Sequence, residues 1–144
     1  MKAKDYLKQL EKLDTIIGNK LVEKEQWKAI ALGVTAHSDG ERVQSSGSKQ
    51  KMADAVNRCI DIDAEIDRLI DRLVDLKHDV TSVIEQLNAT EYDVLHKKYV
   101  QHLSYLDIAE LKRRDYNWVT TVHGRALKNV QRILDERENN EDNT

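Results

Sequence analysis

A repeat of apolar residues between residues 49 and 88 constrains the fold of this chain more than any other feature. The apolar side chains recur in alternating steps of three and four, with charged residues between them. This spacing predicts one long helix with a single apolar stripe, which a partner helix must cover. The stripe consists of Met52, Ala55, Cys59, Ile62, Ile66, Leu69, Leu73, Leu76, Val80, Val83 and Leu87.

A second helix earlier in the chain can cover that stripe. Residues 3 to about 31 have an apolar side of their own, which begins at Tyr6 and Leu10. Residues 32–48 hold three glycines and four serines without periodicity, which predicts a mobile loop. The sequence contains no proline, so long uninterrupted helices are allowed. We therefore expect residues 1–88 to form a long antiparallel helical hairpin, a coiled coil.

Further apolar residues lie beside the main stripe of the long helix. They are Ile60, Ile70, Val74 and Ile84. Such residues widen the apolar face and indicate a second contact, either with the C-terminal region or with another copy of the chain. We expect self-association through the hairpin.

Residues 89–137 predict three shorter helices. Thr90 and Ser104 are expected N-caps, because each precedes an apolar run and is followed by acidic residues in the first turn. Leu106, Ile108, Ala109 and Leu111 are the expected inner side of the middle helix. Lys112 to Asp115 form the turn, and the last helix runs from residue 116 or 117 to about 137. Residues 138–144 are polar and acidic, which predicts a disordered tail.

The last helix has two distinct faces. The expected buried stripe is Val119, Val122, Ala126, Val130 and Ile133. The second stripe contains no acidic residue, has Trp118 and Gly124 beside it, and consists of Asn117, Thr121, Arg125, Lys128 and Arg132. Asn and Arg side chains can form paired hydrogen bonds with adenine and guanine edges in the major groove of DNA. His123 lies between the two faces, where packing or a phosphate contact is expected.

Charge is unevenly distributed along the chain. Residues 90–134 hold eight basic and five acidic residues, a net charge of +3, whereas the whole chain carries −3. Lys112, Arg113 and Arg114 place three positive charges in the turn before the last helix. This pattern favours a helix-turn-helix that binds DNA phosphates and bases. An ordinary amphipathic helix with a solvated basic face is the competing interpretation.

Residues 90–134 resemble region 4 of bacterial sigma factors. The resemblance is carried by Glu91-Tyr92-Asp93-Val94-Leu95, Tyr99, the run from Leu103 to Glu110, and Arg125-Ala126-Leu127. It implies a recognition helix that contributes Tyr116, Asn117, Trp118, Thr120, Thr121, Gly124, Arg125 and Lys128. The turn departs from the family pattern, because Lys112 to Asp115 replace a leucine-glycine pair and include no glycine.

Before residues 90–134 come a helical hairpin, the loop sequence Gly40–Ser48 and the helical sequence Asp61–Lys77. With these segments, most of the chain is similar to phage-encoded late transcription regulators of the RinA and ArpU type. This resemblance implies a sequence-specific regulator of phage or prophage genes in the bacterial cytoplasm. Its partners would be double-stranded DNA and bacterial RNA polymerase. No segment resembles the promoter-melting part of a complete sigma factor. Two alternatives stay open: a phage packaging component similar to a terminase small subunit, and a coiled-coil adaptor that binds RNA polymerase without DNA.

The sequence does not favour an enzyme, a cofactor or a membrane span. The five histidines have no metal-binding spacing, Cys59 lies on the apolar stripe, and no phosphate-binding glycine loop is present. No apolar run approaches the roughly 20 residues that a membrane helix needs. The residues predicted to contact DNA are Lys112, Arg113, Arg114, Tyr116, Asn117, Trp118, Thr120, Thr121, Arg125 and Lys128.

Overall fold

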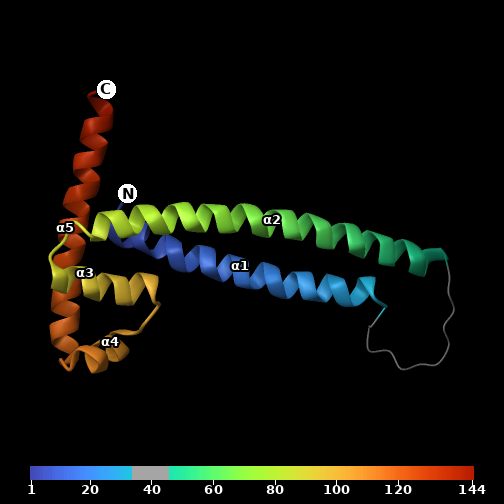
Figure 1. Ribbon diagram of the computed structural model, residues 1–144, viewed down its shortest axis with the longest axis horizontal. Coiled ribbons are helices and arrows are strands. Elements are labelled where there is room, and N and C mark those ends of the chain that lie inside the picture. Colours follow the sequence, from blue (N-terminus) through green and yellow to red (C-terminus); the bar gives the residue numbers. More distant parts are fainter. Residues whose placement is uncertain (34–45) are drawn as a thin grey trace. The chain divides into compact units, whose positions relative to one another are not determined.

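Every regular element of the structure is helical within the residues that it describes. The structure, a computed structural model, describes residues 1–33 and 46–144 (Figure 1). The all-α class predicted from the sequence is therefore confirmed for these ranges. The elements are α1 (Ala3–Ala31), α2 (Ser46–Ile84), α3 (Ala89–Leu95), a π-helical turn η1 (His96–Val100), α4 (Tyr105–Lys112) and α5 (Tyr116–Asp142). The predicted mobile loop at 32–48 lies mostly outside the described residues, although α2 already begins at Ser46.

The chain divides into two compact units. One comprises Asp14–Arg72, and the other combines Met1–Leu13 with Leu73–Thr144. This division differs from the expected boundary between residues 88 and 89. The first turns of α1 and the last turns of α2 belong to the same unit as α3, α4 and α5. An apolar stripe shows that a partner is needed, but it does not show which helix supplies the partner.

In the Asp14–Arg72 unit, α1 and α2 run antiparallel. Ion pairs connect Lys20 to Glu65 at 2.8 Å and Lys24 to Asp63 at 2.6 Å, so residue numbers rise on one helix as they fall on the other. Ala55, Ile62 and Ile66 of the predicted stripe are buried. Met52, which the pattern also assigned to the stripe, is 39 % exposed.

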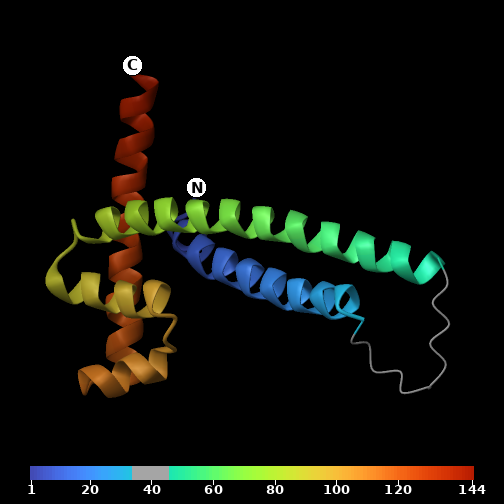
Figure 2. The same cartoon turned by 45° about the vertical axis from the view of Figure 1, so that its right-hand side comes forward.

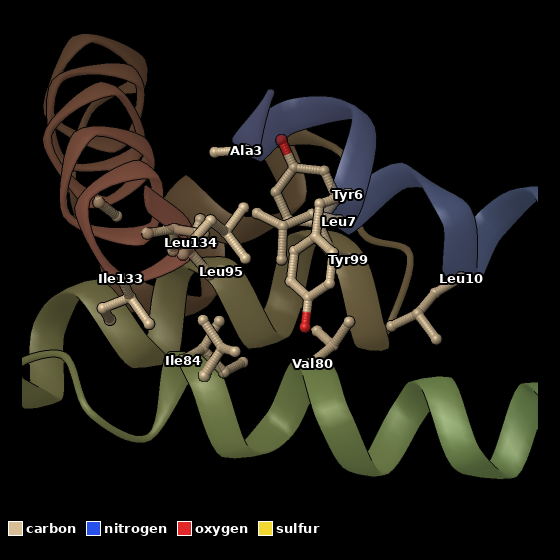
Figure 3. Close-up of a cluster of buried hydrophobic side chains, with 13 residues drawn as sticks. Ala3, Tyr6, Leu7, Leu10, Val80, Ile84, Leu95, Tyr99, Ile133 and Leu134 are labelled. Atoms are coloured by element: carbon tan, nitrogen blue, oxygen red, sulfur yellow. The ribbon is translucent and has the colours of Figure 1, made fainter. Parts of the chain in front are cut away.

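The core of the other unit is built from helices that are far apart in sequence. Figure 3 shows α1 contributing Leu7 and α2 contributing Val80 and Ile84. Leu95 from α3 and Leu134 from α5 complete the group that lies at its centre. Ile84, one of the residues beside the main stripe, is thus buried within this unit, whereas Ile60, Ile70 and Val74 are 61 %, 42 % and 59 % exposed.

The helices α3, α4 and α5 are grouped together in Figure 2. A second, smaller cluster of buried side chains comes from these three helices. It consists of Val94, Ile108, Ala109, Val119 and Val122. Only part of the predicted inner side of α4 is buried, because Leu106 and Leu111 are 68 % and 62 % exposed. Residues rotate by about 100° per position along a helix, so Leu106 lies nearly opposite Ile108 and cannot share its face.

Polar contacts fasten α5 to the start of the chain. The backbone N–H of Ala3 donates to Oε1 of Gln131 at 2.7 Å, and the Gln131 amide donates to the carbonyl of Met1 at 3.1 Å. Arg137 donates to Asp79 of α2 at 3.1 Å, and the Tyr6 hydroxyl donates to the same carboxylate. The helix α5 continues to Asp142, beyond its predicted end near residue 137. Most of the tail predicted to be disordered, residues 138–144, is therefore helical.

Candidate nucleic-acid interface

The two predicted faces of α5 are separated in the structure as the spacing indicates. Val119, Val122, Ala126, Val130 and Ile133 are all buried, which confirms the predicted apolar stripe. The side chains of Asn117, Thr121, Arg125, Lys128 and Arg132 are all exposed. Because α3 and α4 cover the opposite side, this polar stripe is the face of α5 that a ligand can reach. Arg132 is partly engaged by Glu136 at 3.9 Å.

Two side-chain caps fix the helices around the turn. The Ser104 hydroxyl accepts a hydrogen bond from the Asp107 N–H at 3.1 Å, which confirms Ser104 as the N-cap of α4. The Asp115 carboxylate accepts from the Trp118 N–H at 2.8 Å and caps α5. The cap of α3 is Asn88, not Thr90 as predicted, because the Asn88 side-chain oxygen accepts from the Glu91 N–H at 2.9 Å.

In this turn, which contains no glycine, Arg113 occupies the position at the end of α4 that glycine usually takes. It ends α4 in the left-handed region, with φ 54° and ψ 45°, the conformation that glycine usually supplies at this place. The following N–H, of Arg114, donates back to the Ala109 carbonyl at 2.9 Å and closes the helix end. The turn predicted at Lys112–Asp115 thus consists of Arg113, Arg114 and the cap Asp115.

Replacing Arg113 should reveal the strain of this left-handed residue. Arg113→Gly should be more stable than Arg113→Ala by about 1 kcal/mol, because only alanine keeps the Cβ that disfavours this conformation. Both variants lose the same charge, so their difference isolates the backbone. Urea denaturation followed by circular dichroism measures it. Equal stability of the two variants would contradict the left-handed geometry.

Lys112 holds α4 against α3. Its ammonium lies 2.6 Å from the Asp93 carboxylate, which also pairs with Lys97 at 2.6 Å. Burial acts to raise the pKa of Asp93, but the hydrogen bonds from Lys112 and Lys97 outweigh it and hold that pKa below its usual value. Of the three basic residues predicted for the turn, Lys112 is therefore engaged within the protein, whereas Arg113 and Arg114 are exposed.

Trp118 forms a platform beside the polar stripe. The indole is half-buried, and the Arg114 guanidinium lies over it at 5.0 Å from the ring centroid. Arg114, Asn117, Trp118 and Thr121 line one groove together with the cap Asp115. A neighbouring groove is bordered by Arg114, Trp118 and Val122, by Arg125, and by the start of α3 from Asn88 to Glu91. The two grooves bring the turn and the polar stripe into one surface.

Three other residues implied by the resemblance have different surroundings. The Thr120 hydroxyl donates to the Asn117 carbonyl at 3.1 Å, so it is engaged with its own helix. Tyr116 is 47 % exposed and meets Tyr105 edge-on at 5.9 Å. Gly124 is exposed, and a Cβ placed there would meet no atom within 4 Å. It leaves an opening between the side chains of the polar stripe.

Two polar residues, His123 and Glu91, are buried behind the polar stripe, and the sequence predicted a packing role only for His123. His123 is 6 % exposed and takes the packing role expected for it, with Nε2 at 2.6 Å from the Tyr99 hydroxyl. Burial, together with the positive charges of Lys4 and Lys98 nearby, lowers the pKa of His123 to about 4. Glu91 is 3 % exposed and accepts two hydrogen bonds from the Asn129 amide, at 3.1 and 2.9 Å. The sequence placed Glu91 only at a helix start.

The described part of the chain shows neither a metal centre nor a membrane segment. In residues 1–33 and 46–144, no three His, Cys, Asp or Glu side chains gather closely enough to hold a metal ion. None of the helices in these ranges combines the length and the apolar character that crossing a membrane requires. No protein-family model, curated protein or solved structure matches this chain.

Proposed function

We propose that this protein is a sequence-specific DNA-binding transcription regulator of phage or prophage genes. The observation that carries the proposal is the exposed polar stripe of α5 on a helix whose opposite face is buried. In this proposal α4, the turn and α5 act as a helix-turn-helix, and α5 lies in the major groove. The resemblance of residues 90–134 to sigma factor region 4 supports the same assignment.

The exposed residues divide into base contacts and phosphate contacts. Asn117 and Thr121 stand at the start of α5, where recognition helices reach base edges, and Trp118 offers an apolar surface for a thymine methyl group. Arg125 and Lys128 follow one to two turns later and can reach the flanking phosphates. Arg113 and Arg114 add two positive charges beside the start of the same helix.

Selection of bound sequences from random duplex DNA tests the proposal. A common motif should emerge from the full chain, and Asn117→Ala should relax the preference at one position of that motif. Failure to enrich any motif would contradict sequence-specific binding. Retention of bacterial RNA polymerase without any DNA shift would favour the adaptor alternative instead.

Substitution of Gly124 provides a second prediction for this surface. Gly124→Leu should stabilise the protein by about 0.5–1 kcal/mol, because the position is helical and open, yet weaken DNA binding roughly tenfold by keeping α5 away from the groove. Gly18→Leu is the matched control, because Gly18 is also exposed, helical and free of neighbours within 4 Å. Thermal denaturation and fluorescence anisotropy measure the two effects. Unchanged DNA affinity in Gly124→Leu would exclude close approach at this glycine.

A further inference from the structure

One side of the Asp14–Arg72 unit is marked by the ion pair between Lys24 of α1 and Asp63 of α2. The pairs Lys20–Glu65 and Glu23–Arg58 lie on the other side of the same two helices. This follows from helix geometry, since Arg58 is turned by about 140° around α2 from Asp63. The Lys24–Asp63 pair therefore defines one side of the unit.

Large apolar side chains are exposed on that side. Val56 and Ile70 each stand seven residues from Asp63, which turns them by only about 20°, and they are 46 % and 42 % exposed. Ile60, turned by about 60°, is 61 % exposed. Leu21 on α1 lies three residues before Lys24 and is 48 % exposed. The Lys24 face comprises Leu21, Lys24, Val56, Ile60, Asp63 and Ile70.

The charges of the Lys24 face are arranged so that it complements itself. The lysines, Lys24 and Lys28, are on α1, whereas the aspartates, Asp63 and Asp67, are on α2. A two-fold axis parallel to the helices would place α1 of each copy over α2 of the other. Lysines would then face aspartates across the interface, whereas packing α1 against α1 would bring like charges together.

We propose that the Lys24 face is a self-association surface, on which two copies pack face to face into a four-helix arrangement. Each copy would cover the exposed Leu21, Val56, Ile60 and Ile70 of the other. Covering these side chains favours association, because it removes apolar surface from water. The Lys24–Asp63 pair would gain a counterpart from the second copy. The proposal does not depend on DNA binding.

A glutamate placed on the Lys24 face should separate the two copies. Val56→Glu replaces an apolar contact of the Lys24 face by a carboxylate that would lose its water on association, so it should weaken association at least about a hundredfold. Val22→Glu is the matched control: it is also an exposed valine, 58 % accessible, but it is turned about 160° around α1 from Lys24. Light scattering across a concentration series measures the mass, and circular dichroism verifies that each variant is helical.

The expected masses are clear. The wild-type protein and Val22→Glu should have twice the 16.7 kDa mass of one chain, and Val56→Glu should have the mass of one chain. Leu21→Glu, on the other helix of the face, should repeat the result if Val56→Glu fails to fold. A wild-type protein that remains a single chain at the highest concentration would overturn the proposal. Dimers of both Val56→Glu and Leu21→Glu would overturn it as well.

Discussion

Reversing both charges of Arg125 and Lys128 to glutamate should abolish most of the affinity for DNA. Each residue is exposed on the polar stripe and is expected to make a charge-assisted hydrogen bond to a phosphate, worth about 1.5–3 kcal/mol. Losing both should weaken binding on the order of a hundredfold or more. The slope of log K against log salt should become shallower by roughly 1.8, since each phosphate contact contributes about 0.9.

The control for this experiment carries the same change in net charge elsewhere. Lys49 and Lys51 are exposed on α2, in the other compact unit, and their reversal to glutamate also lowers the charge by four. This control should alter affinity only slightly and should leave the salt slope unchanged. Gel-shift titrations of the selected duplex at several salt concentrations give both quantities. Equal losses in the two double variants would show that Arg125 and Lys128 are not phosphate contacts.

Acid should destabilise the unit that contains His123. The pKa of this buried histidine is about 4 in the folded chain and about 6.5 when unfolded. Between these values the unfolded chain binds the extra proton, so stability is complete above pH 6.5 and falls as the pH drops toward 4. Below pH 4 both states are protonated and the effect levels off. Its full size is about 3 kcal/mol.

His123→Gln isolates this effect from the titration of the carboxylates. Glutamine can still hydrogen-bond to the Tyr99 hydroxyl, but it carries no charge at any pH. Urea denaturation at pH 7 and pH 4.5 should therefore show a larger loss of stability in the wild-type protein than in the variant. Identical losses in both proteins would mean that His123 does not stay neutral in the folded chain.

The sequence predicted those features of the fold that depend on local periodicity. The heptad stripe located α2, and the three- and four-residue spacing in the last helix separated its buried face from Asn117, Thr121 and Arg125. Ser104 was predicted as a cap because a hydroxyl three residues before an N–H can satisfy it without help from the rest of the chain. Short-range geometry was not sufficient everywhere, since the cap of α3 is Asn88 and not the predicted Thr90.

Features that depend on distant contacts could not be predicted in this way. The buried Glu91 requires Asn129, and the triad of Tyr6, Asp79 and Arg137 joins three helices from different parts of the chain. The left-handed Arg113 was missed because nothing local favours arginine in that conformation. The candidate interface also depends on a distant contact. Lys112 pairs with Asp93 because α4 lies against α3, and the local sequence around Lys112 does not indicate this partner.

The hydrogen bond between Ala3 and Gln131 has a consequence for biosynthesis. Its two partners are separated by 128 positions, and Leu7 beside it is fully buried by helices from the second half of the chain. While the ribosome is still extending the nascent chain, the residues around Leu7 have no partner and expose their apolar surface. This unit can therefore close only after α5 has been translated, so its core forms through contacts between residues that are far apart in sequence.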